Sequence, residues 1–122
     1  YFVWEDERNS DVSGVDIYAQ HVNSSGEITH DSNGELICNA EKKQFNPLVR
    51  NDGSGGAIMV WGDQRTGGSY GMNIQHLTSS GPTLTANGKQ SFWTNRILRF
   101  YNIKLVSIYI HRMYLLCLGI II

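Results

Sequence analysis

One short signature occurs twice in this 122-residue sequence and limits the possible folds more than any other feature. Each copy reads apolar run, Trp, any residue, Asp, any residue, Arg. The copies are Trp4, Asp6 and Arg8 near the start of the chain, and Trp61, Asp63 and Arg65 in its middle. The short motifs Gln-His, Ser-Ser-Gly and Asn-Gly follow each copy in the same order. Between the first copy and the second, the Trp residues are 57 positions apart, the Gln-His pairs 55 and the Asn-Gly pairs 54. This indicates an internal repeat, and periods of about 40–50 residues are typical of propellers and repeat arrays.

Composition changes abruptly near residue 90. Residues 1–90 contain all 11 acidic residues and 12 of the 13 glycines, whereas residues 91–122 contain 4 basic residues and no acid. Two such compositions rarely share one packed core. We therefore divide the chain into a partial β repeat at 1–44, a complete β repeat at 45–90 and a hydrophobic, non-repeat tail at 91–122. The acidic balance of residues 1–90 argues against nucleic acid as a partner.

Short strands separated by turn-rich segments are predicted in both repeats. In the second repeat they cover 45–50, 57–61, 72–77 and 82–86; in the first they cover 3–4 (the end of a strand), 15–22 and 35–39. Residues 57–61 are continuously apolar, which predicts a strand covered on both faces. Four antiparallel strands in about 55 residues are the content of one propeller blade. The predicted fold class is all-β, with one and a half to two antiparallel four-stranded propeller-like blades.

The Trp, Asp and Arg of each signature share one face of a strand, because side chains two residues apart point the same way. At that spacing, roughly 7 Å, the guanidinium can pair with the carboxylate and stack on the indole. We interpret Trp4, Asp6 and Arg8 as a first structural clasp, and Trp61, Asp63 and Arg65 as a second. The alternative is a carboxylate and guanidinium site for a sugar or an acid. Recurrence favours the structural interpretation, because a packing device is reused in every repeat and a catalytic site is usually built once.

The order of these landmarks resembles the tandem β-propeller-type repeats of large secreted and surface bacterial proteins. The resemblance rests on Val-Trp-x-Asp-x-Arg, on Asp-Ile-Tyr-Ala-Gln-His-Val at 16–22 and on Asn-Asp-Gly-Ser-Gly-Gly-Ala-Ile at 51–58, and it covers residues 1–90 only. The second copy departs from it at 71–75, where Gly-Met-Asn-Ile-Gln stands. The turn at 51–56 also resembles the Asp-box of sialidase propellers, but it lacks the flanking Ser/Thr and Thr, so no sialidase chemistry carries over.

No residue is predicted to act in catalysis or to bind a cofactor or a metal ion. Gln20 and His21 match Gln75 and His76 in the repeat. We interpret all four as repeat-matched strand positions and the two histidines as half-exposed, and a channel lined by the two histidines is the alternative. No nucleophile with a base, phosphate-binding glycine loop or pair of carboxylates at a defined spacing is present in the sequence.

Two further features have simple interpretations. Asp6, Asn9 and Asp11 form an oxygen-rich loop of the kind that Ca²⁺ prefers, but the spacing is not that of an EF-hand and Arg8 lies inside it. We interpret it as a solvated loop. Cys38 stands in a short apolar run and matches no metal-binding spacing, so we expect a buried free thiol.

The tail at 91–122 has three interpretations. The first is out-of-frame translation, the second is a helical, membrane-associating segment, and the third is an edge strand and helix packed on the repeats. Residues 103–122 approach the roughly 20 residues that a bilayer requires. However, Lys104, His111 and Arg112 lie inside that stretch, and charged residues there are costly.

The repeat and the absence of a catalytic pattern predict a non-catalytic structural or binding module, and the resemblance implies that it belongs to an extracellular or cell-surface bacterial protein. Its expected partners are neighbouring repeats of a longer chain, and a protein or a glycan as ligand, with membrane contact only through the tail. One alternative is a fragment of a glycan-processing, sialidase-like propeller enzyme with its active site on missing blades. The other is a surface module anchored in a membrane by residues 103–122.

Overall fold

The computed structural model describes residues 1–67 and 71–91, which form strands and turns without a helix. The first sheet is antiparallel and contains, in spatial order, β1 (Phe2–Asp6), β2 (Asp16–Gln20) and β3 (Glu35–Cys38). The second sheet contains β4 (Gln44–Asn51), β5 (Ala57–Asp63), β6 (Gly71–Thr78), β7 (Gly81–Pro82) and β8 (Lys89–Ser91). It is also antiparallel, and β7 and β8 pair with different stretches of β6. The prediction of an all-β antiparallel fold is confirmed.

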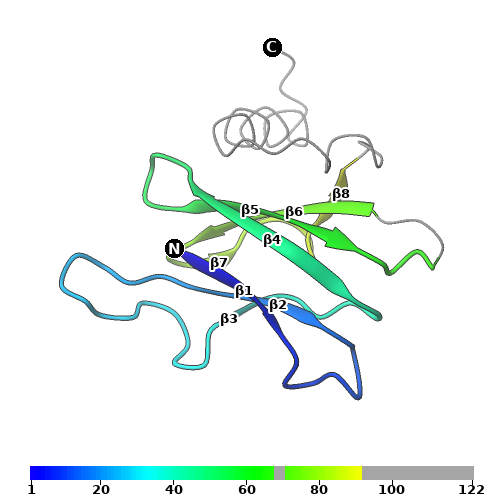
Figure 1. The fold of residues 1–122 in the computed structure, drawn as a ribbon. Coiled ribbons are helices and arrows are strands. Elements are labelled where there is room, and N and C mark those ends of the chain that lie inside the picture. Colours follow the sequence, from blue (N-terminus) through cyan, green and yellow to red (C-terminus); the bar gives the residue numbers. More distant parts are fainter. Residues whose placement is uncertain (68–70, 92–122) are drawn as a thin grey trace, which may run out of the picture.

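The two sheets pack against each other, with the blue and cyan strands of the first sheet lying along one face of the green second sheet (Figure 1). The core between them contains Ile17, Ala19, Ile37 and Cys38 from the first sheet, and Ala57, Met59, Trp61 and Leu77 from the second. Alternate residues of a strand face opposite ways. A second buried cluster therefore lies on the other face of the second sheet, and it contains Ile58, Val60, Met72 and Ile74. All 7 residues of β5 are buried, so the prediction that this strand is covered on both faces is confirmed.

Strand β4 is irregular near its start. Its pairing with β5 shifts in register between Phe45 and Leu48, and Asn46 has a φ of 52°. Pro47 cannot donate a backbone N–H to a ladder, and Asn adopts positive φ more readily than most residues. Asn46 donates its N–H to Glu5 Oε1 of β1 at 2.8 Å, which links the two sheets. Gln44 and Phe45 pair with β5 before this irregularity, and regular pairing resumes at Leu48.

The last strand of the second repeat is not where the sequence predicts it. A strand is predicted at 82–86, but only Gly81–Pro82 pairs with β6 there, and pairing resumes at Lys89–Ser91. The chain turns between them, where Asn87 and Gly88 both have positive φ. The strand predicted at 15–22 is also shorter, because Val22 makes only an isolated bridge, to Ile28.

The predicted tail at 91–122 lies outside the described residues apart from Ser91, and so does the segment at 103–122 on which the membrane interpretation depends. In the part of the chain that the structure describes, no helix has the length and apolar character needed to cross a membrane. The arrangement of the sheets as propeller blades stays a prediction.

Candidate functional site

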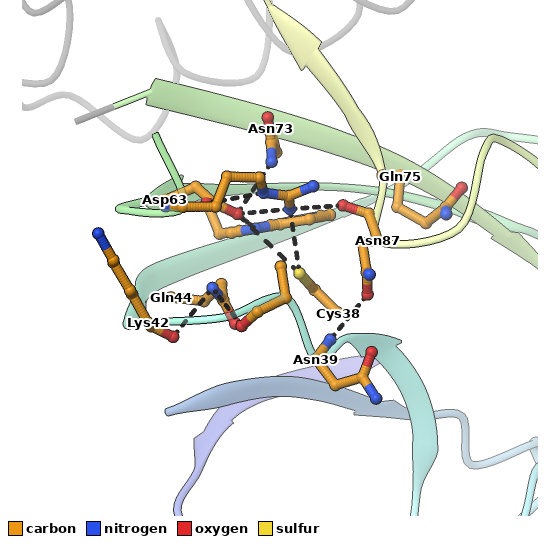
Figure 2. Close-up of polar contacts among 12 residues, drawn as sticks. Cys38, Asn39, Lys42, Gln44, Asp63, Asn73, Gln75 and Asn87 are labelled. Carbon is orange, nitrogen blue, oxygen red and sulfur yellow. Dashed lines mark hydrogen bonds and ion pairs between the residues drawn. The ribbon is translucent and has the colours of Figure 1, made fainter. Parts of the chain in front are cut away.

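The second clasp encloses a buried carboxylate at the end of β5 (Figure 2). Asp63 Oδ1 accepts hydrogen bonds from the backbone N–H and the Nε–H of Arg65, both at 2.9 Å. Asp63 Oδ2 accepts hydrogen bonds from Trp61 Nε1 at 3.2 Å, Arg65 Nη2 at 2.6 Å and Asn73 Nδ2 at 2.9 Å. Arg65 Nη2 also donates to the carbonyl of Asn87 at 2.8 Å, which joins the clasp to the turn before β8. Because a carboxylate has about four lone-pair sites, no acceptor site of Asp63 is left over.

The first clasp makes the same bonds at the end of β1. Asp6 Oδ1 accepts the backbone N–H of Arg8 at 3.0 Å and its Nε–H at 2.7 Å. Asp6 Oδ2 accepts Trp4 Nε1–H at 2.9 Å and Arg8 Nη2–H at 2.5 Å. Arg8 Nη2 donates to the carbonyl of Asn33 at 2.9 Å, as its counterpart does to the matching asparagine. The structure therefore brings together the three residues that the sequence assigned to each clasp.

A glycine lies against each indole and accounts for the two Asn-Gly landmarks. Gly34 and Gly88 have φ values of 93° and 74°, a region that favours glycine. A Cβ built on Gly34 would lie 2.6 Å from Trp4 Cη2, and one on Gly88 would overlap Trp61 Cη2. Any larger residue would therefore displace the indole as well as strain the backbone.

The two matching glutamines hold the hairpin that follows each clasp. Gln20 donates from Nε2 to the carbonyl of Asp31 at 2.7 Å, and its Oε1 accepts the backbone N–H groups of His21 at 2.9 Å and His30 at 3.2 Å. The matching partners of Gln75 are the carbonyl of Thr85 at 3.1 Å and the N–H groups of His76 at 3.0 Å and Leu84 at 2.9 Å. In both repeats the glutamine side chain thus bonds to backbone groups across the hairpin, where backbone-to-backbone hydrogen bonds would otherwise join the strands.

The two matching histidines share one contact and differ in the other. His21 Nδ1 lies 2.8 Å from Thr29 Oγ1, and His76 Nδ1 lies 3.0 Å from Thr83 Oγ1. The His21 ring also stacks on Tyr1, with 4.4 Å between centroids. Both imidazoles are partly exposed and contact their own hairpins; His76 lies within β6, whereas His21 directly follows β2.

His76 has a second partner in the turn between β4 and β5. Its Nε2 lies 2.7 Å from Asp52 Oδ2. Burial raises the pKa of Asp52, but hydrogen bonds from His76 and from the backbone N–H groups of Ser54 and Gly56 outweigh it, and the net pKa is lowered. This pair anchors the turn to β6, which the sequence did not reveal.

Electrostatics hold both clasp carboxylates in their charged form. The Arg8 side chain, through its hydrogen bonds, keeps the pKa of Asp6 far below its usual range, against the opposing effect of burial. For Asp63, burial raises the pKa, but the hydrogen bonds and charge of Arg65 outweigh it and the pKa is lowered. Burial raises the pKa of the Cys38 thiol to about 11, so this thiol is protonated and unreactive at neutral pH.

The surroundings of the two clasps differ. Trp61 is 1% exposed because the first sheet covers it. Across the gap between the sheets, Arg65 Nη2 lies 3.2 Å from Cys38 Sγ, and Asn87 Oδ1 accepts the backbone N–H of Asn39 at 2.8 Å. Figure 2 shows Cys38 and Asn39 reaching the second clasp from the side of the first sheet. The second clasp is therefore part of the contact between the sheets.

The first clasp packs against an aromatic ring of its own sheet. The guanidinium of Arg8 lies over the ring of Tyr18, 4.0 Å from its centroid, and Tyr18 stacks on Trp4 with 6.3 Å between centroids. The sequence-based expectation of Arg stacking on the indole omitted this ring. Instead, the indole N–H donates to the carboxylate, and the cross-strand tyrosine provides the stacking surface.

Sequence reasoning missed the partners that come from other elements: the carbonyls of Asn33 and Asn87, the amide of Asn73, the thiol of Cys38 and the carboxylate of Asp52. The recurring Asn-Gly was the available signal for the first two. Among residues 1–67 and 71–91, no three His, Cys, Asp or Glu side chains form a group that could bind a metal ion. No family model, curated protein or solved structure matches this chain.

Proposed function

We propose that this chain is a non-catalytic structural module, built from propeller-type β repeats, of an extracellular or cell-surface bacterial protein. In this proposal the clasps fasten the end of one strand in each repeat. The repeats then pack face to face and present their loops to partners, which are neighbouring repeats and a protein or glycan ligand.

One observation carries the proposal: both clasp carboxylates are saturated by donors from the protein itself. Asp6 accepts four hydrogen bonds. Asp63 accepts five from its own unit and a sixth, long one from the Cys38 thiol of the first sheet at 4.0 Å. In each case two come from the side chain of the neighbouring arginine. A general acid or base must exchange a proton with a substrate, and a binding site must offer free donors or acceptors. Groups this fully paired are suited to holding structure.

The location of the module is supported by the resemblance of residues 1–90 to repeats of secreted and surface bacterial proteins. The order β4, β5, β6, β8 supports the blade, because four neighbouring antiparallel strands are what one blade contains. The packing of two such sheets through one core supports stacking between repeats.

A double-mutant cycle on the second clasp tests this proposal. Asp63→Asn, Arg65→Gln and the double variant are unfolded with urea and followed by far-UV circular dichroism. A structural clasp predicts that each single change lowers the free energy of unfolding, and that the pair couples by about 0.5–3 kcal/mol. Residues kept for function often reduce stability, so single variants that are as stable as the parent, or more so, would contradict the structural role.

A further inference from the structure

The outer face of the first sheet is apolar and uncovered by any other described strand. Phe2 is 60% exposed and Leu36 is 38% exposed. Trp4 pairs across the strands with Tyr18, and Tyr18 pairs with Leu36, so these side chains adjoin one another. In Figure 1 the second sheet lies on only one side of the first. Tyr18 itself is 8% exposed and Trp4 is partly buried, so Phe2 and Leu36 are the most exposed apolar groups of this face. Exposed apolar side chains gathered on one face mark an interaction surface.

The matching face of the second sheet shows what covers such a surface. By the repeat, the positions of Phe2, Trp4, Tyr18 and Gln20 correspond to Met59, Trp61, Asn73 and Gln75. All four of the latter are between 0% and 2% exposed. The side chains packed on that face include Ile17, Ala19, Ile37 and Cys38 of the first sheet. The covering surface is thus a β-sheet that presents small and aliphatic side chains.

Polar groups at the edge of the covered face fix how the two sheets meet. Arg65 contacts the Cys38 thiol, and Asn87 accepts a backbone N–H from Asn39. Their counterparts on the outer face are Arg8, whose side chain is 38% exposed, and Asn33, which is also exposed. The outer face therefore carries the same polar groups at the same places as the covered face.

We infer that the outer face of the first sheet, formed by Phe2, Trp4, Tyr18 and Leu36, docks a second β-sheet of the same kind, which presents small aliphatic side chains as Ile17 and Ala19 do. The inference rests on the proposed function and names the partner of the first clasp. The carboxylate of Asp6 is paired with Arg8 and accepts four hydrogen bonds, so it offers no free acceptor to a sugar. An apolar sheet matches it better.

The experiment adds such a sheet and measures whether it covers the face. A second copy of residues 39–91 is joined through a flexible Gly/Ser linker to Tyr1 of the full chain. This copy carries Val60, Met72 and Ile74, which match Val3, Ile17 and Ala19 in the repeat. Leu36→Cys is introduced in a Cys117→Ser background, and the rate of maleimide labelling is compared between the original and extended chains.

Docking predicts labelling about tenfold slower or more in the extended chain, because a covered thiol reacts only when the sheets open. Leu48→Cys is the matched control: Leu48 is 44% exposed on β4 of the second sheet, and its labelling should not change.

Docking should also raise the Tm of the extended chain. Leu36→Asp should abolish that increase while leaving the Tm of the original chain nearly unchanged.

Equal labelling of Leu36→Cys in both chains overturns the inference. This holds even if the added copy fails to fold, because a repeat that docks on its neighbour is stabilised by it and should fold. Protection that appears in the original chain as its concentration rises would assign the face to self-association and also overturns it. The double-mutant cycle on Asp63 and Arg65 uses the original chain alone. A failure of docking is therefore distinguishable from a failure of the proposed function.

Discussion

The two clasps of this chain have nearly the same hydrogen bonds and very different surroundings. Trp61 lies between two sheets and is 1% exposed, whereas Trp4 lies on the outer face of the first sheet and is only partly buried. The arginine of each clasp nevertheless donates to the same two groups, the clasp carboxylate and the carbonyl of the matching asparagine. The comparison shows that the clasp forms from its own unit and does not require a covering sheet.

The residue across from the indole reflects this difference. On β6 that position is Asn73, which donates to the clasp carboxylate inside the core at 2.9 Å. On β2 it is Tyr18, which covers Trp4 and Arg8 with its own ring. Where a second sheet seals the clasp, an amide completes the polar network. Where no described strand covers it, an aromatic ring shields it.

The largest expected effect is the loss of the buried indole. Trp61→Ala should lower the free energy of unfolding by about 3–5 kcal/mol, because it opens a cavity between the sheets. It also removes one donor to Asp63. Trp4→Ala should cost clearly less, because its indole is already partly in water. Urea unfolding followed by circular dichroism measures both, and equal losses would show that the covering sheet adds nothing to the second clasp.

The glycines under the indoles should give the next largest effects. Gly88→Ala and Gly34→Ala each add backbone strain and a clash with an indole, and we expect losses of about 1–3 kcal/mol. Gly88→Ala should be the worse of the two, because Trp61 has no room to move. Gly53→Ala is the control, with a φ of 85° and nothing within 4 Å of the added Cβ. Thermal unfolding that ranks Gly53→Ala level with Gly88→Ala would contradict the clash.

Acid should weaken both clasps, since the folded pKa values of Asp6 and Asp63 are lowered. A carboxyl group whose folded pKa lies below its unfolded value of about 3.9 adds stability above that pH, and this stability is lost as the pH falls through the folded pKa. Denaturant midpoints should therefore decline below about pH 4. Asp63→Asn and Asp6→Asn should each make the decline shallower, and Asp6→Asn should do so at least as strongly, because the pKa of Asp6 is lowered further. A decline that is the same in all three proteins would place the acid sensitivity elsewhere.

The smallest expected effect is at Phe2, the apolar residue two positions before Trp4, whose counterpart in the repeat is Met59. Phe2→Ser should change the free energy of unfolding by no more than about 0.5 kcal/mol, because Phe2 is 60% exposed. Met59→Ser, at the fully buried counterpart, should cost at least about 2 kcal/mol. Urea titrations of the two variants side by side measure the difference. A large loss for Phe2→Ser would mean that the outer face is covered within this chain.

Much of the local structure could be predicted because it depends on neighbours in sequence. The apolar run at 57–61 and the turn-rich segments predicted antiparallel strands. The Trp, Asp and Arg of each signature are two residues apart, and this spacing predicted that they share one face of a strand. The fourth strand was misplaced because Gly81–Pro82 and Lys89–Ser91 pair with β6 on either side of the Asn87-Gly88 turn, and pairing across a turn leaves no periodic signal in so short a segment.

The contacts between units could not be predicted. Nothing in the spacing of Cys38 indicates that its thiol lies beside Arg65, or that Asn39 donates to Asn87. The pair of Asp52 and His76 joins residues that are 24 positions apart. Such pairs depend on how the sheets and turns meet, and a single sequence carries no record of that geometry.

Residue spacing along the chain predicted most of the strands, the turns and the composition of each clasp, because a β-strand places alternate side chains on one face whatever surrounds it. Which clasp is buried depends on how the two sheets pack. The same Trp, Asp and Arg lie in a dry core when a second sheet covers them and at the surface when none does. That difference depends on contacts between segments that are far apart in the sequence. The alternation of side chains along one strand carries no information about such contacts.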